Sequence, residues 1–193
     1  MAVNGFRREA RVWEPWSVAT YLDRILDHHR SVAAGDDRDS DDLRQRCESL
    51  PAARGFRSAL QGAPTLSVIS EVKRRSPSKG DLAADLDPAE LATTYESAGA
   101  SCLSVLTDGP HFGGSAEDLV KARSAVSLPV LRKDFTVARN DVLDARLMGA
   151  DAVLLIAAAL DDEELSEFAG VARDVGLDVL FEIHDEAELR RVD

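Results

Sequence analysis

The pattern of apolar and polar residues changes near residue 64 of this chain. Before that point no run is typical of a strand, and residues 17–34 carry apolar side chains at roughly helical spacing, which predicts a helix. The acidic stretch at 35–42 predicts a solvated loop, and residues 43–50 predict a second short helix before Pro51. We expect residues 1–62 to form an N-terminal helical extension with an acidic linker.

From residue 64 onward, short apolar runs alternate with longer segments of mixed polarity. Each short run is rich in β-branched or aliphatic residues and ends on a polar side chain, as buried strands do. The expected strands lie at residues 66–72, 102–106, 130–133, 152–156 and 178–182.

Capping residues and glycines mark the helices between these strands. Asp87 followed by Pro88 predicts the start of one helix, because Asp is favoured at the N-cap and Pro at the first helical position. The other expected starts are at Ser115, Asn140 and Asp161 or Asp162, and the expected ends are at Gly99, Gly149 and Gly176.

A helix between successive strands predicts parallel pairing through right-handed crossovers. Strands that are apolar on both faces agree with a parallel sheet covered by helices on each side. The fold class is therefore α/β, and the spacing fits both a doubly wound sheet and a (β/α)₈ barrel. The chain contains neither a dinucleotide-binding glycine motif nor a phosphate-binding P-loop motif. Its 193 residues are fewer than the roughly 250 of a complete barrel.

Composition narrows the classes of function. The 35 acidic residues outnumber the 23 basic ones, which argues against nucleic acid as a partner. The longest apolar run, 152–160, is shorter than a membrane helix, and the N-terminal residues lack the apolar core of a signal peptide. Cys47 and Cys102 form no disulfide framework and no metal-binding motif, so a cytoplasmic protein is expected. His28 and His29 are expected to have surface or packing roles.

Candidate chemistry lies where the strands end, because active sites of α/β folds form at the carboxyl ends of their strands. Only four basic residues are lysine, the type whose side chain can be tuned to release a proton. Lys73 and Glu71 lie two apart after the first strand and face the same side, while Lys133 ends the third strand and Glu182 the fifth. Two interpretations stay open: a buried cluster of ion pairs, or a set of acids and bases for proton transfer.

Several motifs resemble one family in the same order along the chain. Residues 64–190 resemble indole-3-glycerol phosphate synthases, and the predicted helix at 17–34 is similar to the N-terminal helix of that family. The matching motifs lie at residues 70–80, 103–108, 112–115, 128–135, 149–156 and 177–184.

This resemblance implies a (β/α)₈ barrel that acts in tryptophan biosynthesis as a carboxy-lyase. The small anionic substrate would be 1-(2-carboxyphenylamino)-1-deoxyribulose 5-phosphate, which closes to indole-3-glycerol phosphate with loss of CO₂ and water, and no cofactor or metal is implied. Lys133 matches the general acid, Glu182 the general base, Lys73 a substrate-binding lysine and Glu71 the carboxylate that positions it. The substrate-contacting positions matched are Ser76, Phe112, Phe135, Leu154 and Ile156, although plain core packing explains the last two equally well.

The chain departs from the family pattern at its end. It stops at Asp193, just after the fifth strand, so the family's segments of strands six to eight and their phosphate-binding loops are absent. We expect residues 63–193 to form a partial barrel, truncated after about five βα units, inactive alone and prone to self-association through its open edges. Two alternatives remain: a non-catalytic half-barrel, and another phosphate-binding barrel such as phosphoribosylanthranilate isomerase, whose usual cysteine after the first strand is missing here.

Overall fold

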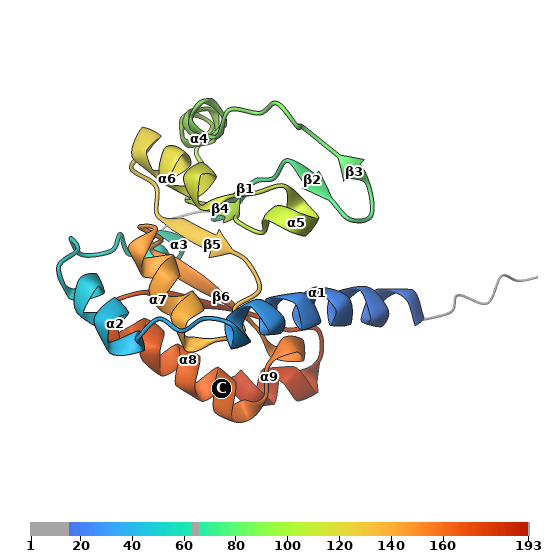
Figure 1. Ribbon diagram of the computed structural model, residues 1–193. Helices are drawn as coiled ribbons and strands as arrows, with labels where there is room; N and C mark the ends of the chain where they lie inside the picture. The colour runs from blue at the N-terminus through green and yellow to red at the C-terminus, as the bar shows by residue number, and fades with distance from the viewer. Residues whose placement is uncertain (1–15, 63–65, 193) are drawn as a thin grey trace, which may run out of the picture.

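A parallel β-sheet forms the centre of the protein (Figure 1). The computed structural model describes residues 16–62 and 66–192. The N-terminal residues, in which no signal peptide is expected, lie outside the described residues. Within the described residues the sheet has five strands in the order β1-β4-β5-β6-β7, and a small antiparallel hairpin, β2-β3, lies apart from it. The strands are β1 (Ile69–Val72), β2 (Arg75–Ser76), β3 (Gly80–Asp81), β4 (Cys102–Leu106), β5 (Val130–Lys133), β6 (Ala152–Ile156) and β7 (Asp178–Glu182).

The predicted α/β class with parallel pairing is confirmed, and four of the expected strands have the predicted bounds. The first strand is shorter than predicted because Ile69 is paired with Cys102, the residue at which β4 begins. The Val68 carbonyl still accepts from the N–H groups of Ser101 and Cys102 at 2.8 and 3.2 Å, whereas Leu66 is largely exposed despite its apolar side chain.

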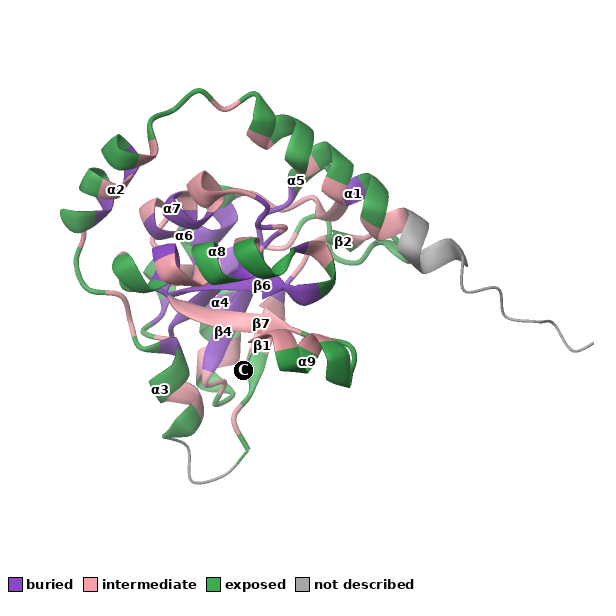
Figure 2. Cartoon of the chain, turned by 90° about the horizontal axis from the view of Figure 1, so that it is seen from below, coloured by how far each residue is buried: buried purple, intermediate pink, exposed green. Residues whose placement is uncertain are grey.

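The two outer strands of the sheet differ from the inner ones. Every residue of β4 and β6 is buried, whereas every residue of β7 is only half-buried (Figure 2). Among the described residues, β1 and β7 each have one neighbour, so this sheet is open rather than closed into a barrel. An open edge leaves backbone N–H and C=O groups available to another strand.

The helices follow the pattern expected for alternating units. Asp87, Ser115 and Asp161 cap α4, α6 and α8 by accepting hydrogen bonds from backbone N–H groups of the first turn, as predicted. The helices are α1 (Trp16–Ala34), α2 (Ser40–Glu48), α3 (Phe56–Gln61), α4 (Pro88–Ser97), α5 (Gly109–Phe112), α6 (Ala116–Ala125), α7 (Arg139–Leu147), the short 3₁₀ helix η1 (Ala157–Ala159), α8 (Asp162–Asp174) and α9 (Glu186–Val192). None of the described helices has the length and apolar character needed to cross a membrane.

The prediction that Asn140 caps a helix is wrong. Helix α7 begins one residue earlier, and its Asp141 accepts hydrogen bonds from the N–H groups of Val137 and Ala138 at 2.9 Å. The Asn140 side chain instead donates to Asp36 at 2.9 Å, across more than a hundred residues of sequence. A tertiary contact therefore uses the amide that local preference assigned to a cap.

The segment at 35–42 forms a largely exposed acidic loop up to Asp39, as predicted, whereas residues 40–42 already belong to α2. Asp39 caps α2, which already begins at Ser40. Arg38 forms ion pairs with Asp36 and with Asp144 of α7, both at 2.8 Å. Arg38 thus links this segment to α7, because its guanidinium pairs with one carboxylate of the segment and one of the helix.

Two apolar clusters lie on opposite faces of the sheet. Alternate residues point to opposite faces of a strand, so Val153 and Leu155 pack outward with the covering helices. Leu154 and Ile156 belong to the inner cluster, where Phe56 of α3 also packs. Helix α3, which the sequence did not predict, therefore covers the inner face of the sheet.

Helix α1 lies near the carboxyl ends of the strands (Figure 1). Its Ile25 is buried. Arg30 on the same helix donates to Glu164 of α8 through both of its terminal nitrogens, at 2.7 and 3.0 Å. These contacts hold α1 in place as one wall of the cavity described below.

Candidate active site

A cavity of about 630 Å³ opens at the carboxyl ends of the strands. All nine site residues predicted from the sequence line it, although they come from β1, β2, α5, β5, β6, β7 and two loops. They are Glu71, Lys73, Ser76, Phe112, Lys133, Phe135, Leu154, Ile156 and Glu182.

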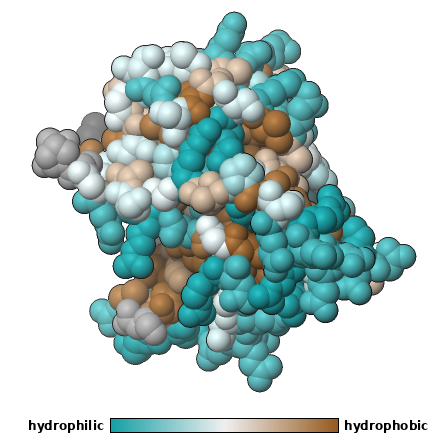
Figure 3. Space-filling view, turned by 90° about the vertical axis from the view of Figure 1, so that its left-hand side faces the viewer, coloured by the Kyte–Doolittle hydropathy of each residue, from teal (hydrophilic) through white to brown (hydrophobic). Residues whose placement is uncertain are grey.

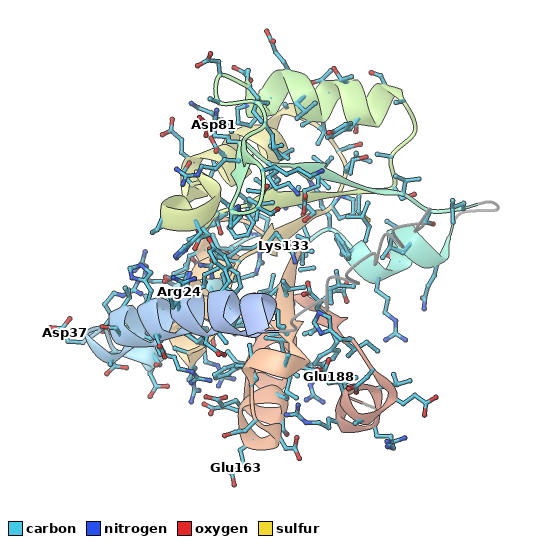
Figure 4. All side chains as sticks on the ribbon, turned by 90° about the vertical axis from the view of Figure 1, so that its right-hand side faces the viewer. Arg24, Asp37, Asp81, Lys133, Glu163 and Glu188 are labelled. Carbon is cyan, nitrogen blue, oxygen red and sulfur yellow. The ribbon has the colours of Figure 1, made fainter. Side chains whose placement is uncertain are left out.

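Lys133 and Glu182 form one ion pair of this cavity. The Lys133 Nζ donates to Glu182 Oε2 at 2.7 Å, and Glu182 Oε1 lies 3.7 Å from His184 Nε2. The Lys133 and Glu182 side chains are 28% and 36% exposed, so both groups remain within reach of a bound molecule. Figure 4 labels Lys133, which lies close to α1 at this end of the sheet.

Lys73 and Glu71 form a second ion pair at the end of β1. The Lys73 ammonium donates to the Glu71 carboxylate, and the two side chains are about one-third exposed. The Tyr95 hydroxyl of α4 donates to the Glu71 carbonyl at 3.1 Å, which ties this strand end to its covering helix. The two lysine–carboxylate pairs thus line the same cavity, one from the end of β1 and the other from the ends of β5 and β7.

A third charged group at the strand ends is buried. Arg132 pairs with Asp134 at 3.0 Å and donates to the Thr107 hydroxyl at 3.2 Å, and Thr107 in turn donates to Asp134. The charges of this group are paired within it, and its side chains are below 10% exposed, so a ligand has little access to them. The strand ends therefore hold both arrangements that the sequence left open: a buried ion-pair network, and lysine–carboxylate pairs that face a cavity.

One side of the cavity is apolar. The rings of Phe112 and Phe135 lie with centroids 6.2 Å apart. Leu154 and Ile156 line the cavity while belonging to the inner core cluster, so packing and cavity lining are not exclusive here. Such a surface fits a flat aromatic ring.

Sequence reasoning missed the contribution of α1 to the cavity. Tyr21, Leu22 and Ile25 line it, opposite the strand ends. Their helical spacing was visible in the sequence. The surface that this helix face covers could not be predicted, because it is formed by strand ends far away in the sequence.

The structure agrees with the expected surface or packing roles of His28 and His29, since His28 is exposed and His29 is half-buried, and it shows which residue His29 contacts. His29 Nε2 lies 2.8 Å from Asp108 Oδ2, and His111 Nδ1 lies 3.0 Å from the same oxygen. Burial opposes protonation of His29, but the hydrogen bond to Asp108 and the charge of Asp134 outweigh it and raise the His29 pKa. Burial likewise opposes ionisation of Asp108, yet the bonds from His29 and His111 hold its pKa well below the usual range.

The amino-acid sequence matches the model of one known protein family. The family model for indole-3-glycerol phosphate synthase matches residues 22–192, which include all nine site residues predicted from the sequence. The chain belongs to the indole-3-glycerol phosphate synthase family. This is a family of TIM barrels, and the resemblance noted in the sequence is confirmed.

Relatives named indole-3-glycerol phosphate synthase are identical to this family member at about half of the aligned positions. The protein of Neisseria meningitidis (strain FAM18) is 54% identical over 147 residues, covering 75% of this chain and 56% of the relative. That of Chlorobium phaeovibrioides is 48% identical over 172 residues, covering 88% and 67%. That of Hyphomonas neptunium is 46% identical over 177 residues, covering 89% and 67%. The chain thus spans between about half and two-thirds of the length of these relatives.

Among solved structures, a mandelate oxidase variant matches with a TM-score of 0.49 and 17% sequence identity, covering 74% of this chain and 50% of that one.

Proposed function

We propose that this chain carries the acid/base half of an indole-3-glycerol phosphate synthase active site. The observation that carries the proposal is the cavity that two lysine–carboxylate pairs share with a wall of aromatic and aliphatic side chains. The substrate would be the phosphorylated 1-(2-carboxyphenylamino)-1-deoxyribulose. The polar pairs suit its keto-sugar part, and the apolar wall suits its benzene ring.

Ring closure requires a carbon–carbon bond between the aromatic carbon that bears the carboxylate and the carbonyl carbon of the sugar chain. Lys133 would donate a proton to the carbonyl oxygen as that bond forms, which turns the oxygen into a hydroxyl. The carboxylate then leaves as CO₂, and the electron pair of its bond restores the aromatic ring. In the dehydration step the hydroxyl would take a proton from one of the two lysine ammonium groups and leave as water. Glu182 would accept a proton from the adjacent nitrogen-bearing carbon, and the electron pair of that C–H bond would form the double bond of the new ring.

Lys73, Glu71 and Ser76 would bind and orient the substrate. Glu71 accepts from the Lys73 ammonium, which limits where that ammonium can point. Ser76, on β2, faces the same cavity from the hairpin side. Phe112, Phe135, Leu154 and Ile156 would enclose the anthranilate ring and exclude water from it.

We further propose that residues 63–193 form the first five βα units of a (β/α)₈ barrel, with residues 1–62 as an extension, in a cytoplasmic protein. In this fold a substrate phosphate is commonly held by loops after strands seven and eight, which this chain does not contain. Without that anchor the reacting carbonyl is poorly held near its acid, so the 193-residue chain alone should be inactive.

Self-association through the open sheet edges is part of the same proposal. β1 and β7 each have a free edge among the described residues. Val68, just before β1, and Ile69, its first residue, are exposed apolar residues. On the face drawn in Figure 3, polar surface predominates and apolar surface lies in patches between it. Size-exclusion chromatography of the purified chain should show oligomers; a monodisperse monomer would contradict this part of the proposal.

A chimera tests the catalytic proposal. This chain would be fused to the part of the Neisseria meningitidis relative that lies beyond their matched region, and formation of indole-3-glycerol phosphate would be followed by its fluorescence. The expected result is turnover by the chimera and none by either piece alone. A folded chimera that binds the substrate but does not convert it would favour the alternative of a non-catalytic half-barrel.

A further inference from the structure

Three of the four histidines of this chain gather beside the cavity. His28 and His29 lie on α1 and His111 on α5, and the three ring centroids lie 5.6 to 6.4 Å from one another. The carboxylate of Asp108, whose side chain is fully buried, lies at the centre of this group. Segments 79 residues apart in sequence thus bring imidazoles and one carboxylate together.

The carboxylate of Asp108 is held with one oxygen free for the imidazoles. Its Oδ1 accepts the backbone N–H groups of His111 at 2.6 Å and Phe112 at 3.0 Å. Its Oδ2 faces His29 Nε2 and His111 Nδ1 at 2.8 and 3.0 Å. A carboxylate fixed by hydrogen bonds on one side, with two imidazole nitrogens on the other, has the features of a prepared metal ligand.

The spacing of these atoms suits a small divalent ion. The three ligand atoms lie within 4.8 Å of one another. Ligand atoms around a tetrahedral zinc, with bonds of about 2.0–2.1 Å, lie about 3.3 Å apart, so only small side-chain movements are needed. Two imidazoles and one carboxylate select a transition metal such as Zn²⁺ over Mg²⁺ or Ca²⁺, which prefer oxygen ligands.

We propose that His29, Asp108 and His111 bind one Zn²⁺ ion, separate from the lysine–carboxylate pairs that we assign to proton transfer. His28 lies close enough to supply a fourth ligand after a rotamer change, and water can take that position otherwise. The ion would join α1 to α5. Because Tyr21 of α1 and Phe112 of α5 both line the cavity, bound zinc would fix two of its walls relative to each other.

Titration of the purified 193-residue chain with Co²⁺ tests the site, because tetrahedral Co²⁺ absorbs visible light and Zn²⁺ displaces it without colour. The expected result is one equivalent of bound Co²⁺ with a tetrahedral spectrum. His29→Ala and His111→Ala should each weaken binding by about tenfold or more. His184→Ala, which removes the one histidine outside the cluster, is the matched control and should bind as the parent does.

Hydrogen exchange supplies a second readout that does not depend on the cobalt spectrum. Zn²⁺ should slow amide exchange in α1 of the parent and leave exchange in α1 of His29→Ala unchanged. Circular dichroism would establish that each variant is folded. Absence of a cobalt spectrum in the parent, or equal affinity in the parent and His29→Ala, would overturn the proposal and leave a hydrogen-bonded cluster without metal.

Discussion

Lys133 and Glu182 end strands that are separated by β6, yet their charged groups meet at 2.7 Å. Neighbouring strands lie about 4.8 Å apart, so strands separated by one other are roughly 10 Å apart at the backbone. Only long side chains that reach inward from the same face can close that distance. The contact therefore fixes which face of the sheet holds the proposed acid and base.

The first prediction concerns Lys133→Arg in the chimera. Arginine keeps the positive charge and the ion pair with Glu182, but it cannot donate a proton at neutral pH. We expect kcat to fall by about 10²-fold or more while circular dichroism remains that of the parent. Lys121→Arg, on the exposed surface of α6, is the matched control. A Lys133→Arg kcat within about threefold of the parent would refute the general-acid assignment.

The second prediction concerns Glu182→Gln. The amide has nearly the shape of the carboxylate but cannot accept the proton released in the dehydration step. Turnover should fall by about 10²-fold or more, while the dissociation constant of the substrate changes little. Glu186→Gln on α9 serves as the control, since that side chain is largely exposed. Loss of affinity with kcat preserved would instead make Glu182 a binding residue.

The third prediction concerns Gly114, between α5 and α6. A Cβ at this position would lie 2.2 Å from the Leu106 carbonyl oxygen, which is backbone at the end of β4 and cannot move aside alone. Gly114→Ala should therefore lower the free energy of unfolding by roughly 1–3 kcal/mol.

Urea unfolding of Gly114→Ala and Gly35→Ala makes the comparison. A Cβ on Gly35 meets its nearest backbone oxygen at 3.6 Å, an ordinary contact, so that variant should unfold near the parent midpoint. Equal loss of stability in the two variants would show that the close approach of Gly114 to β4 does not determine the free energy of unfolding.

The fourth prediction concerns the pH dependence of α1 docking. The hydrogen bond from Arg30 holds the pKa of Glu164 below its usual 4.5. Because the folded pKa is depressed, the contribution of this pair is complete above pH 4.5 and is lost as pH falls through the lower, folded value. The pair is partly exposed, so the contribution should be at most about 1 kcal/mol.

Amide exchange in the C-terminal half of α1, followed as pH is lowered, measures this contribution. In the parent, protection should decrease in the acid range more than in Glu164→Gln, which lacks the carboxylate at every pH. Glu163→Gln removes the neighbouring acid of the same helix turn and should behave like the parent. The same acid dependence in Glu164→Gln would mean that other groups fasten α1.

Strand positions and several helix starts follow from the sequence because they depend on local chemistry. Val130 to Lys133 is apolar with a polar end, and Asp87 before Pro88 carries its own capping oxygen. The cap at Asn140 was predicted wrongly, and the ion pair between the acidic linker and α7 was not predicted, because distant partners decide both. Asn140 binds Asp36, and Arg38 binds Asp144, contacts that no local rule contains.

The sequence by itself determined the α/β class, the strands and the residue types placed at their carboxyl ends. These follow from the spacing of apolar residues, the helix-capping residues and the polar residues that end each strand, all of which depend on neighbours in the sequence. Only the tertiary structure decided which side chains meet. It put Lys133 beside Glu182, closed the cavity with Tyr21 of α1, and surrounded Asp108 with His29 and His111. The physical reason is that such contacts depend on the pairing order of the strands and on where a helix packs, which are set by burial summed over the whole chain.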